Sequence, residues 1–158
     1  MTQAVFSSRS RPAISESALQ QGAVINFTVP GEPVAFARAG RNGKISFTPA
    51  PQRSFMEIVK MFAQRAMAGR APMAGPLAMT LRAVYLHPAS WSLTKKRRTR
   101  FKTSKPDADN IAKLVKDALS KVAYADDAQI VILRVAKRYG PVAQLDVRVW
   151  AAGREASA

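Results

Sequence analysis

The hydrophobic positions near the N-terminal end of the chain fall into short runs that are typical of strands. Residues 24–29 form a short run rich in β-forming residues, which stops at Pro30-Gly31. Residues 36–38 and 44–48 predict two further short strands, and the Asn-Gly pair in the turn at residues 41–43 favours a hairpin. This part of the chain therefore predicts three short strands.

The spacing changes to that of a helix after Pro51, a residue that suits the first helical turn. Apolar residues then recur at helical spacing until Gly69, namely Phe55, Ile58, Val59, Phe62, Ala63 and Ala66. Residues 77–86 alternate apolar and polar side chains well enough to predict a strand, which His87-Pro88 ends. The apolar side of this strand is made by Leu77, Met79, Leu81, Ala83 and Tyr85.

A second helix is expected over residues 109–121, where apolar side chains share one face: Ile111, Leu114, Val115, Ala118 and Val122. Residues 130–135 and 145–150 predict two strands joined by a turn at residues 139–141. The element order β-β-β-α-β-α-β-β predicts an α+β fold, with two main helices packed on a mixed β-sheet.

These elements fit one small domain. We expect it to span residues 23–151, between a flexible N-terminal tail (residues 1–22) and a short C-terminal tail (residues 152–158). Both tails lack a clean hydrophobic period, whereas 47% of the whole chain is hydrophobic and can form a core.

The strong positive charge narrows the possible partners. The 25 lysines and arginines exceed the ten carboxylates by +15, and such an excess repels itself in a folded protein unless a polyanion neutralises it. Nucleic acid is the commonest such partner. A generally basic, ribosome-like surface is one alternative. An anionic membrane surface is another, which the lack of a basic amphipathic helix with a bulky apolar face disfavours.

Composition also excludes several classes of site. The chain has no cysteine and a single histidine, His87, which excludes disulfides, thiolate metal sites and histidine-rich zinc sites. No apolar run approaches the roughly 20 residues of a membrane span, and the N-terminal residues lack the apolar segment of a secretory signal. We therefore expect a cytoplasmic protein that does not contact a membrane.

The carboxylates are unevenly distributed, which points to a metal site. Five of the ten lie between Asp107 and Asp127, and crowded acidic side chains raise one another's pKa unless something offsets their repulsion. Mg²⁺ is the natural candidate, because one or two carboxylates hold it while water and phosphate oxygens complete its octahedron.

The spacing of the acids fits such a site. Asp107 and Asp109 would project the same way from an extended backbone, about 7 Å apart, and Asp109 suits the N-cap of the following helix. Lys113 and Asp117 follow on the outward face of that helix, where Lys113 could stabilise the charge of a transition state. A turn after the helix could return Asp127 to the first two acids. The alternative is a purely structural role, in which Asp-x-Asp only caps the helix and Asp-Asp only forms a turn.

Three motifs resemble those of the RusA family of Holliday junction resolvases. They are residues 105–113 (Lys-Pro-Asp-Ala-Asp-Asn-Ile-Ala-Lys), 117–119 (Asp-Ala-Leu) and 126–130 (Asp-Asp-Ala-Gln-Ile). They carry, in order, the family's Asp-x-Asp-Asn motif, its lysine four residues after the second Asp, its Asp-Ala-Leu and its Asp-Asp-x-Gln-Ile/Val. The resemblance covers roughly residues 24–150.

The resemblance implies an endodeoxyribonuclease that uses Mg²⁺ or Mn²⁺ to resolve Holliday junctions by paired symmetric nicks, in DNA recombination and repair. It also implies an α+β homodimer, expected to be intertwined and often phage- or prophage-borne. The family's catalytic residues match Asp107, Asp109, Asp127 and Lys113, and its metal-binding carboxylates match the same three acids. Asp126 is added as an expected metal ligand, although it, like Asp117, is second-tier and could instead orient water or cap.

A dense basic segment precedes the acids. Residues 95–105 carry seven basic side chains in eleven positions, and we expect them to guide a DNA strand to the metal rather than form a merely solvated loop. Trp91 and Phe101 are expected either to stack on unpaired bases or to pack in the core. With a second patch near the predicted hairpin, the expected DNA contacts are Arg38, Arg41, Lys95, Lys96, Arg97, Arg98, Arg100, Lys102 and Lys105.

The sequence thus predicts a divalent-metal endonuclease acting on four-way DNA junctions. A non-catalytic basic DNA-binding protein, whose acids are only caps and turns, is one alternative. A metal nuclease that cuts forks, flaps or RNA hybrids is the other.

Overall fold

A computed structural model describes residues 24–37, 40–42 and 45–153, with the backbone alone for 40–42 and 45–47. The expected N-terminal tail and most of the C-terminal tail lie outside these residues. The elements are β1 (Val24–Pro30), β2 (Gly40–Asn42), β3 (Ile45–Phe47), α2 (Ala50–Met67), β4 (Leu77–Leu86), α3 (Leu93–Arg98), α4 (Ala108–Leu119), the 3-10 turn η1 (Asp127–Gln129), β5 (Ile130–Gly140) and β6 (Gln144–Ala151).

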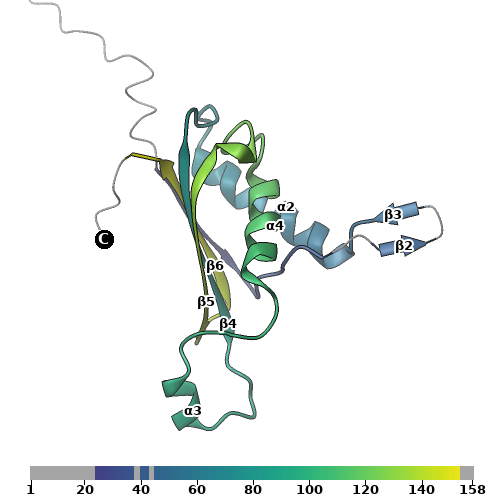
Figure 1. Ribbon diagram of the computed structural model, residues 1–158, viewed down its shortest axis with the longest axis vertical. Helices are drawn as coiled ribbons and strands as arrows, with labels where there is room; N and C mark the ends of the chain where they lie inside the picture. The colour runs from purple at the N-terminus through teal and green to yellow at the C-terminus, as the bar shows by residue number, and fades with distance from the viewer. Residues whose placement is uncertain (1–23, 38–39, 43–44, 154–158) are drawn as a thin grey trace, which may run out of the picture.

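Four strands form one mixed sheet in the order β1-β6-β4-β5 (Figure 1). β6 pairs antiparallel with both β1 and β4, whereas β4 and β5 run parallel. The chain therefore has the predicted α+β fold, and β5 lies at one edge of the sheet. Among the described residues, no helix is both long and apolar enough to cross a membrane.

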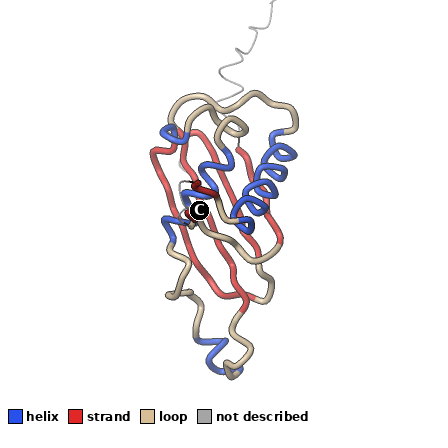
Figure 2. The backbone as a smooth tube through the Cα atoms, turned by 90° about the vertical axis from the view of Figure 1, so that its right-hand side faces the viewer, coloured by secondary structure: helices blue, strands red, loops and turns tan. Residues whose placement is uncertain are grey.

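The two long helices, α2 and α4, cover the same face of the sheet (Figures 1 and 2). β1, β4 and β6 bury mainly the side chains that face these helices, and α4 buries the apolar stripe that its sequence predicts, including Leu114 and Val115. Each fully buried leucine of this kind stabilises the fold by about 2 kcal/mol. The opposite face of the sheet carries no helix in the described part of the chain, and it bears polar side chains such as Thr28, Arg82 and Arg148.

Several predicted elements agree closely with the structure. The strand expected at residues 77–86 has the same bounds as β4, and its expected apolar side is buried. The first helix ends at Met67, because Ala68 adopts a left-handed conformation (φ 49°) just before Gly69. The second helix is shorter than predicted: it begins at Ala108 and ends at Leu119.

The expected hairpin is present, but its first strand lies further along the chain. β2 pairs antiparallel with β3, whereas residues 36–38 were expected to be strand. The cause is tertiary: the Phe36 N–H donates to the Asn110 carbonyl (2.9 Å), and the Ala37 N–H donates to the buried Gln52 side chain (2.8 Å). These bonds tie the segment to α4 and α2. Of the turn predicted at residues 41–43, Arg41 and Asn42 instead belong to β2, and Gly43 lies outside the described residues.

Two features near the basic segment differ from the sequence expectation. Residues 93–98 form the short helix α3, which Ser92 caps by accepting from the Lys95 N–H (3.3 Å). β5 extends to Gly140, five residues beyond its expected end at residue 135. The extension is supported on both sides, by the continuous register with β4 and by backbone bonds that the segment around Phe101 makes to the outer edge of β5.

Candidate functional site

The start of α4 carries two of the predicted site carboxylates. Asp107 is the N-cap residue, with extended backbone (φ −76°, ψ 149°), and Asp109 lies in the first turn, so the prediction of Asp109 as the cap was wrong. The Asp107 side chain makes no capping hydrogen bond. Both side chains are exposed, as are Lys113 and Asp117 further along the outward face. A pair of uncommitted carboxylates beside the positive end of a helix is thereby presented to solvent.

The loop that leads to Asp107 is held by a lysine outside the three sequence motifs. Lys137 of β5 donates to the carbonyls of Ser104 (2.9 Å) and Pro106 (2.7 Å). These two bonds fix the backbone immediately before Asp107, so Lys137 positions the carboxylate without touching it. The signal in the sequence is the position of this lysine, on the side of β5 that Val135 and Tyr139 pack against the core.

Lys113 is oriented by an aromatic ring. Its ammonium lies 4.0 Å from the centroid of the Phe36 ring, a distance typical of a cation–π contact. The bond from Phe36 to Asn110 fixes this ring against the first turns of α4. Phe36 was predicted only as part of a strand, and its role depends on a contact between segments more than 70 residues apart in sequence.

Asp126 and Gln129 form a structural clasp around η1. Asp126 Oδ1 accepts from the Ala128 N–H (2.8 Å), and Gln129 Oε1 accepts from the Asp126 N–H (3.1 Å), which together make a capping box. The amide group of Gln129 also donates to the Met73 and Gly75 carbonyls. The hydrogen bond from Ala128 lowers the pKa of Asp126. Half of the Asp-Asp-x-Gln motif is thus explained by local structure.

Asp127 lies near the far end of α4 from Asp109. Its Oδ2 is 3.2 Å from Lys116 Nζ, and Lys116 follows Asp109 by seven residues, about 10 Å along a helix axis. Within the described part of the chain, no three metal-ligating side chains come together. The turn expected to return Asp127 to Asp107 and Asp109 therefore does not unite these acids in one chain.

The segment after α4 is fixed at that end by buried contacts. Tyr124 is fully buried and its hydroxyl donates to the Lys116 carbonyl (3.0 Å), while the Met73 N–H donates to the Ala123 carbonyl (2.8 Å). Burial, and then the charges of Asp127 and Asp117, raise the pKa of Tyr124 far above its usual range, so the hydroxyl stays a donor. These contacts hold Asp127 where it is.

The basic segment is attached to the ends of β4 and β5 through aromatic side chains. His87 stacks on Tyr139 (5.0 Å between ring centroids), Trp91 meets Tyr139 edge-on (5.2 Å), and Lys95 lies 4.4 Å from the Trp91 ring. Trp91 therefore packs within the protein, whereas Phe101 is 58% exposed. Of the expected contacts near the hairpin, Arg38 lies outside the described residues and Arg41 is described by its backbone alone, in β2.

Comparison with known proteins bears directly on these motifs. The family model for endodeoxyribonuclease RusA matches residues 30–150. The chain is also similar to YqaN of Bacillus subtilis (strain 168), an uncharacterized protein, with 37% identity over 144 residues that cover 85% of this chain and 98% of the relative. The matched range contains α4, η1, the basic segment and the strands that hold them.

Proposed function

Because the chain belongs to the endodeoxyribonuclease RusA family, and is thus a nuclease, we propose that it resolves four-way DNA junctions by paired nicks that depend on Mg²⁺. The observation that carries this proposal is the exposed pair Asp107 and Asp109 at the start of α4, with Lys113 one turn further along and a basic segment leading to the pair. Mn²⁺ is the expected substitute metal.

The side chains at the start of α4 fit a hard cation. Two carboxylates with oxygen ligands to spare are what Mg²⁺ usually takes from a protein. A bound metal would polarise the scissile phosphate and ready a water for in-line attack. Asp107 and Asp109 would hold it, with Lys137 fixing the backbone before the first of them. Asp126 as a further metal ligand stays a prediction. Its Oδ1 already accepts the hydrogen bond from the Ala128 N–H, which leaves Oδ2 for a metal.

The remaining residues bind and orient the strand. Lys113, held by Phe36, would place its positive charge beside a non-bridging phosphate oxygen as negative charge develops there. The exposed side chains of α3, which include Arg97 and Arg98, would contact the backbone of the incoming DNA. These contacts position the duplex and carry no sequence information.

We further propose that the protein acts as a homodimer through the outer edge of β5. Val131, Ile132 and Leu133 are 60%, 45% and 42% exposed, and a long apolar edge strand is a ready template for pairing with another chain. Among the described residues, only the segment around Phe101 pairs with this edge, and it does so at the far end, near Arg138.

A second copy of the chain suits this edge because its Asp127 could complete the site that Asp107 and Asp109 begin. Consider an antiparallel pair of two β5 strands centred on Leu133. Asp127 lies six residues before this centre, so it falls opposite residue 139 of the other subunit, which lies six residues after it. That is the end of β5 at which Lys137 holds the loop to Asp107. The two-fold axis would thus bring Asp127 toward Asp107 of the partner subunit, and the site would be completed twice.

The dimer proposal is tested by placing a charge on the axis. Leu133→Asp is expected to give a folded monomer with greatly reduced cutting. The new carboxylate would face its own copy across the two-fold axis, and the two negative charges would repel each other. Sedimentation velocity measures the oligomeric state. The matched control is Ile58→Asp, an equally exposed apolar residue on α2 (40%), which should change neither. A dimer that survives Leu133→Asp would show that the interface lies elsewhere.

The function itself is tested with purified full-length protein and a labelled four-way junction, in Mg²⁺ and in EDTA. We expect two symmetric nicks in Mg²⁺ and none in EDTA, since a chelator removes the cation that the carboxylates hold. Forks, flaps and linear duplex at the same salt concentration serve as competitors, because affinities depend steeply on salt. Cutting that persists in EDTA would contradict the metal site, and a preference for forks would replace the junction as substrate.

A further inference from the structure

The helix-free face of the sheet holds an arginine-lined pocket that the proposed cleavage site does not use. We propose that this pocket binds a backbone phosphate of DNA, as a second contact on the opposite side of the sheet from α4. The proposal rests on the proposed function in one respect only, namely that DNA is the ligand.

The pocket is an open hollow of about 400 Å³ at the end of the sheet where β4 and β5 finish. Its polar lining includes Arg82, Arg100, Arg138 and Gln144, beside Tyr139 and the apolar surface of Val84, Pro141 and Val142. No carboxylate lines it. Three guanidinium groups around one hollow repel one another, and their planar forks match the geometry of phosphate oxygens.

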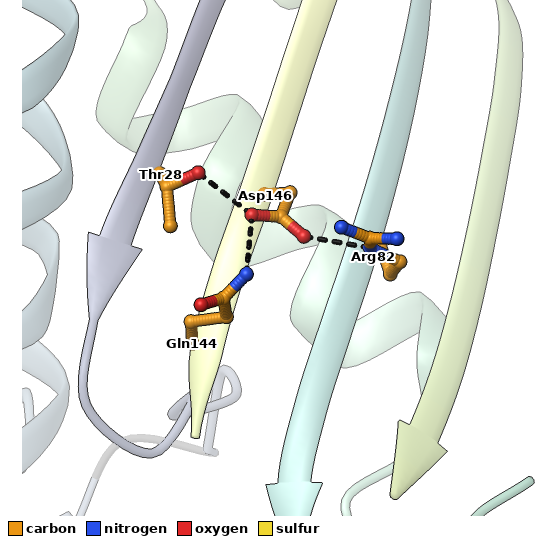
Figure 3. Close-up of polar contacts among 4 residues, drawn as sticks. All are labelled: Thr28, Arg82, Gln144 and Asp146. Carbon is orange, nitrogen blue, oxygen red and sulfur yellow. Dashed lines mark hydrogen bonds and ion pairs between the residues drawn. The ribbon is translucent and has the colours of Figure 1, made fainter. Parts of the chain in front are cut away.

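Arg82 is already oriented for such a ligand. Its Nε donates to Asp146 Oδ2 (2.6 Å), and Asp146 Oδ1 accepts from Thr28 (2.7 Å) and Gln144 (2.9 Å) (Figure 3). Burial opposes the ionisation of Asp146, but these hydrogen bonds outweigh it and lower the pKa of the carboxyl group. A fixed anion behind Arg82 holds its Nε, and the terminal nitrogens of the fork remain for a ligand in the pocket.

Arg138 is held in place but not neutralised. Its guanidinium carbon lies 5.2 Å from the centroid of the Phe101 ring, and its buried Nε has no hydrogen-bond partner among the described residues. A buried donor left unpaired is unfavourable, and no carboxylate offsets the charge of this guanidinium within the pocket. The exposed ring of Phe101 and the charge of Arg138 thus form one surface.

The pocket is continuous with the basic segment, which favours nucleic acid over an acidic protein as the ligand. Arg100 belongs to both, since its carbonyl accepts from the Tyr139 N–H (2.9 Å) while its side chain lines the pocket. A positively charged path therefore runs from α3 past Arg100 to Arg82 and Arg138. A phosphate chain supplies negative charge at regular intervals along such a path.

The pocket is tested by the salt dependence of junction binding. In full-length protein carrying Asp109→Asn to prevent cutting, Arg138→Gln is expected to weaken binding about eight-fold at 0.1 M salt, and to lower the slope of log K against log salt by about one. Arg138→Lys keeps the charge and should keep the slope. Arg148→Gln is the matched control, because Arg148 lies on the same face but over the Trp150 ring, outside the pocket.

Each outcome decides the proposal. A slope that Arg138→Gln lowers no more than Arg148→Gln does would overturn it. A second result would also overturn it: labelled polyglutamate binds more tightly than DNA, and Arg138→Gln abolishes this binding but leaves the salt slope for DNA unchanged. The ligand of the pocket would then be an acidic protein. If Arg138→Gln does not fold, as thermal unfolding would show, Arg82→Gln gives the same test, because Arg82 lines the pocket and lies outside the basic segment. A protein that shows the slope change but never cuts DNA would refute the nuclease proposal and leave the pocket standing.

Discussion

Asp109→Asn is expected to lower the rate of junction cutting at least about 100-fold and to leave junction binding unchanged or tighter. The amide keeps the size of the side chain but removes one of the two carboxylate charges at the start of α4. Even residues one step removed from a metal ligand typically contribute 10–100-fold, so a direct ligand is expected to contribute more. Binding improves because a negative charge near the phosphates is lost.

The measurement is single-turnover cutting of a labelled four-way junction, with binding followed in parallel by fluorescence anisotropy. Asp117→Asn is the matched control: it removes the same charge from the same exposed face of α4, two turns further from the helix start. It should retain most of the activity. Unchanged cutting by Asp109→Asn would show that the carboxylate pair is only part of a helix start.

A mixture of Asp109→Asn and Asp127→Asn chains is expected to regain cutting that neither variant has alone. If each site takes Asp107 and Asp109 from one chain and Asp127 from the other, a mixed dimer contains one site with both changes and one intact site. Random exchange of subunits makes half of the dimers mixed, so about a quarter of the normal number of sites is restored.

The same experiment excludes a site built within one chain. In that case every site of the mixed dimer carries one change, and mixing restores nothing. The variants are mixed, left to exchange, and assayed for single nicks, because a mixed dimer can cut only one of the two symmetric strands. Full recovery of paired cuts would contradict the shared site, and so would no recovery once subunit exchange has been shown with labelled chains.

The agreement between sequence and structure is best where the signal is local. The alternation over residues 77–86 predicted both ends of β4, and the apolar stripe of α4 predicted which side faces the core. Periodicity reports how a segment meets its own neighbours, so it survives without knowledge of the fold. The positions of caps were less secure, because Asp107 and Asp109 are both good caps and only the path of the incoming loop decides between them.

The position of Asp127 could not be predicted from the local sequence. The Asp-Asp-x-Gln motif marks Asp127 in the sequence, but its position depends on Tyr124 and on the contact of residue 123 with Met73, about 50 residues away in sequence. The pocket on the helix-free face has the same origin. Arg82, Arg100 and Arg138 come from three separate segments, and the sequence indicates only Arg100, within the basic segment, as a DNA contact.

The sequence by itself determined the α+β class, the acidic motifs, the positive charge that favours a polyanion, and the family resemblance that the comparison then confirmed. Those properties follow from residue types and short spacings. The tertiary structure alone decided that one chain separates Asp127 from Asp107 and Asp109, and that Lys137 holds the loop before them. It also decided that, among the described residues, the outer edge of β5 is paired only near Arg138. These depend on how strands distant in sequence pair, and each pairing is set by the burial of the whole sheet rather than by any one segment.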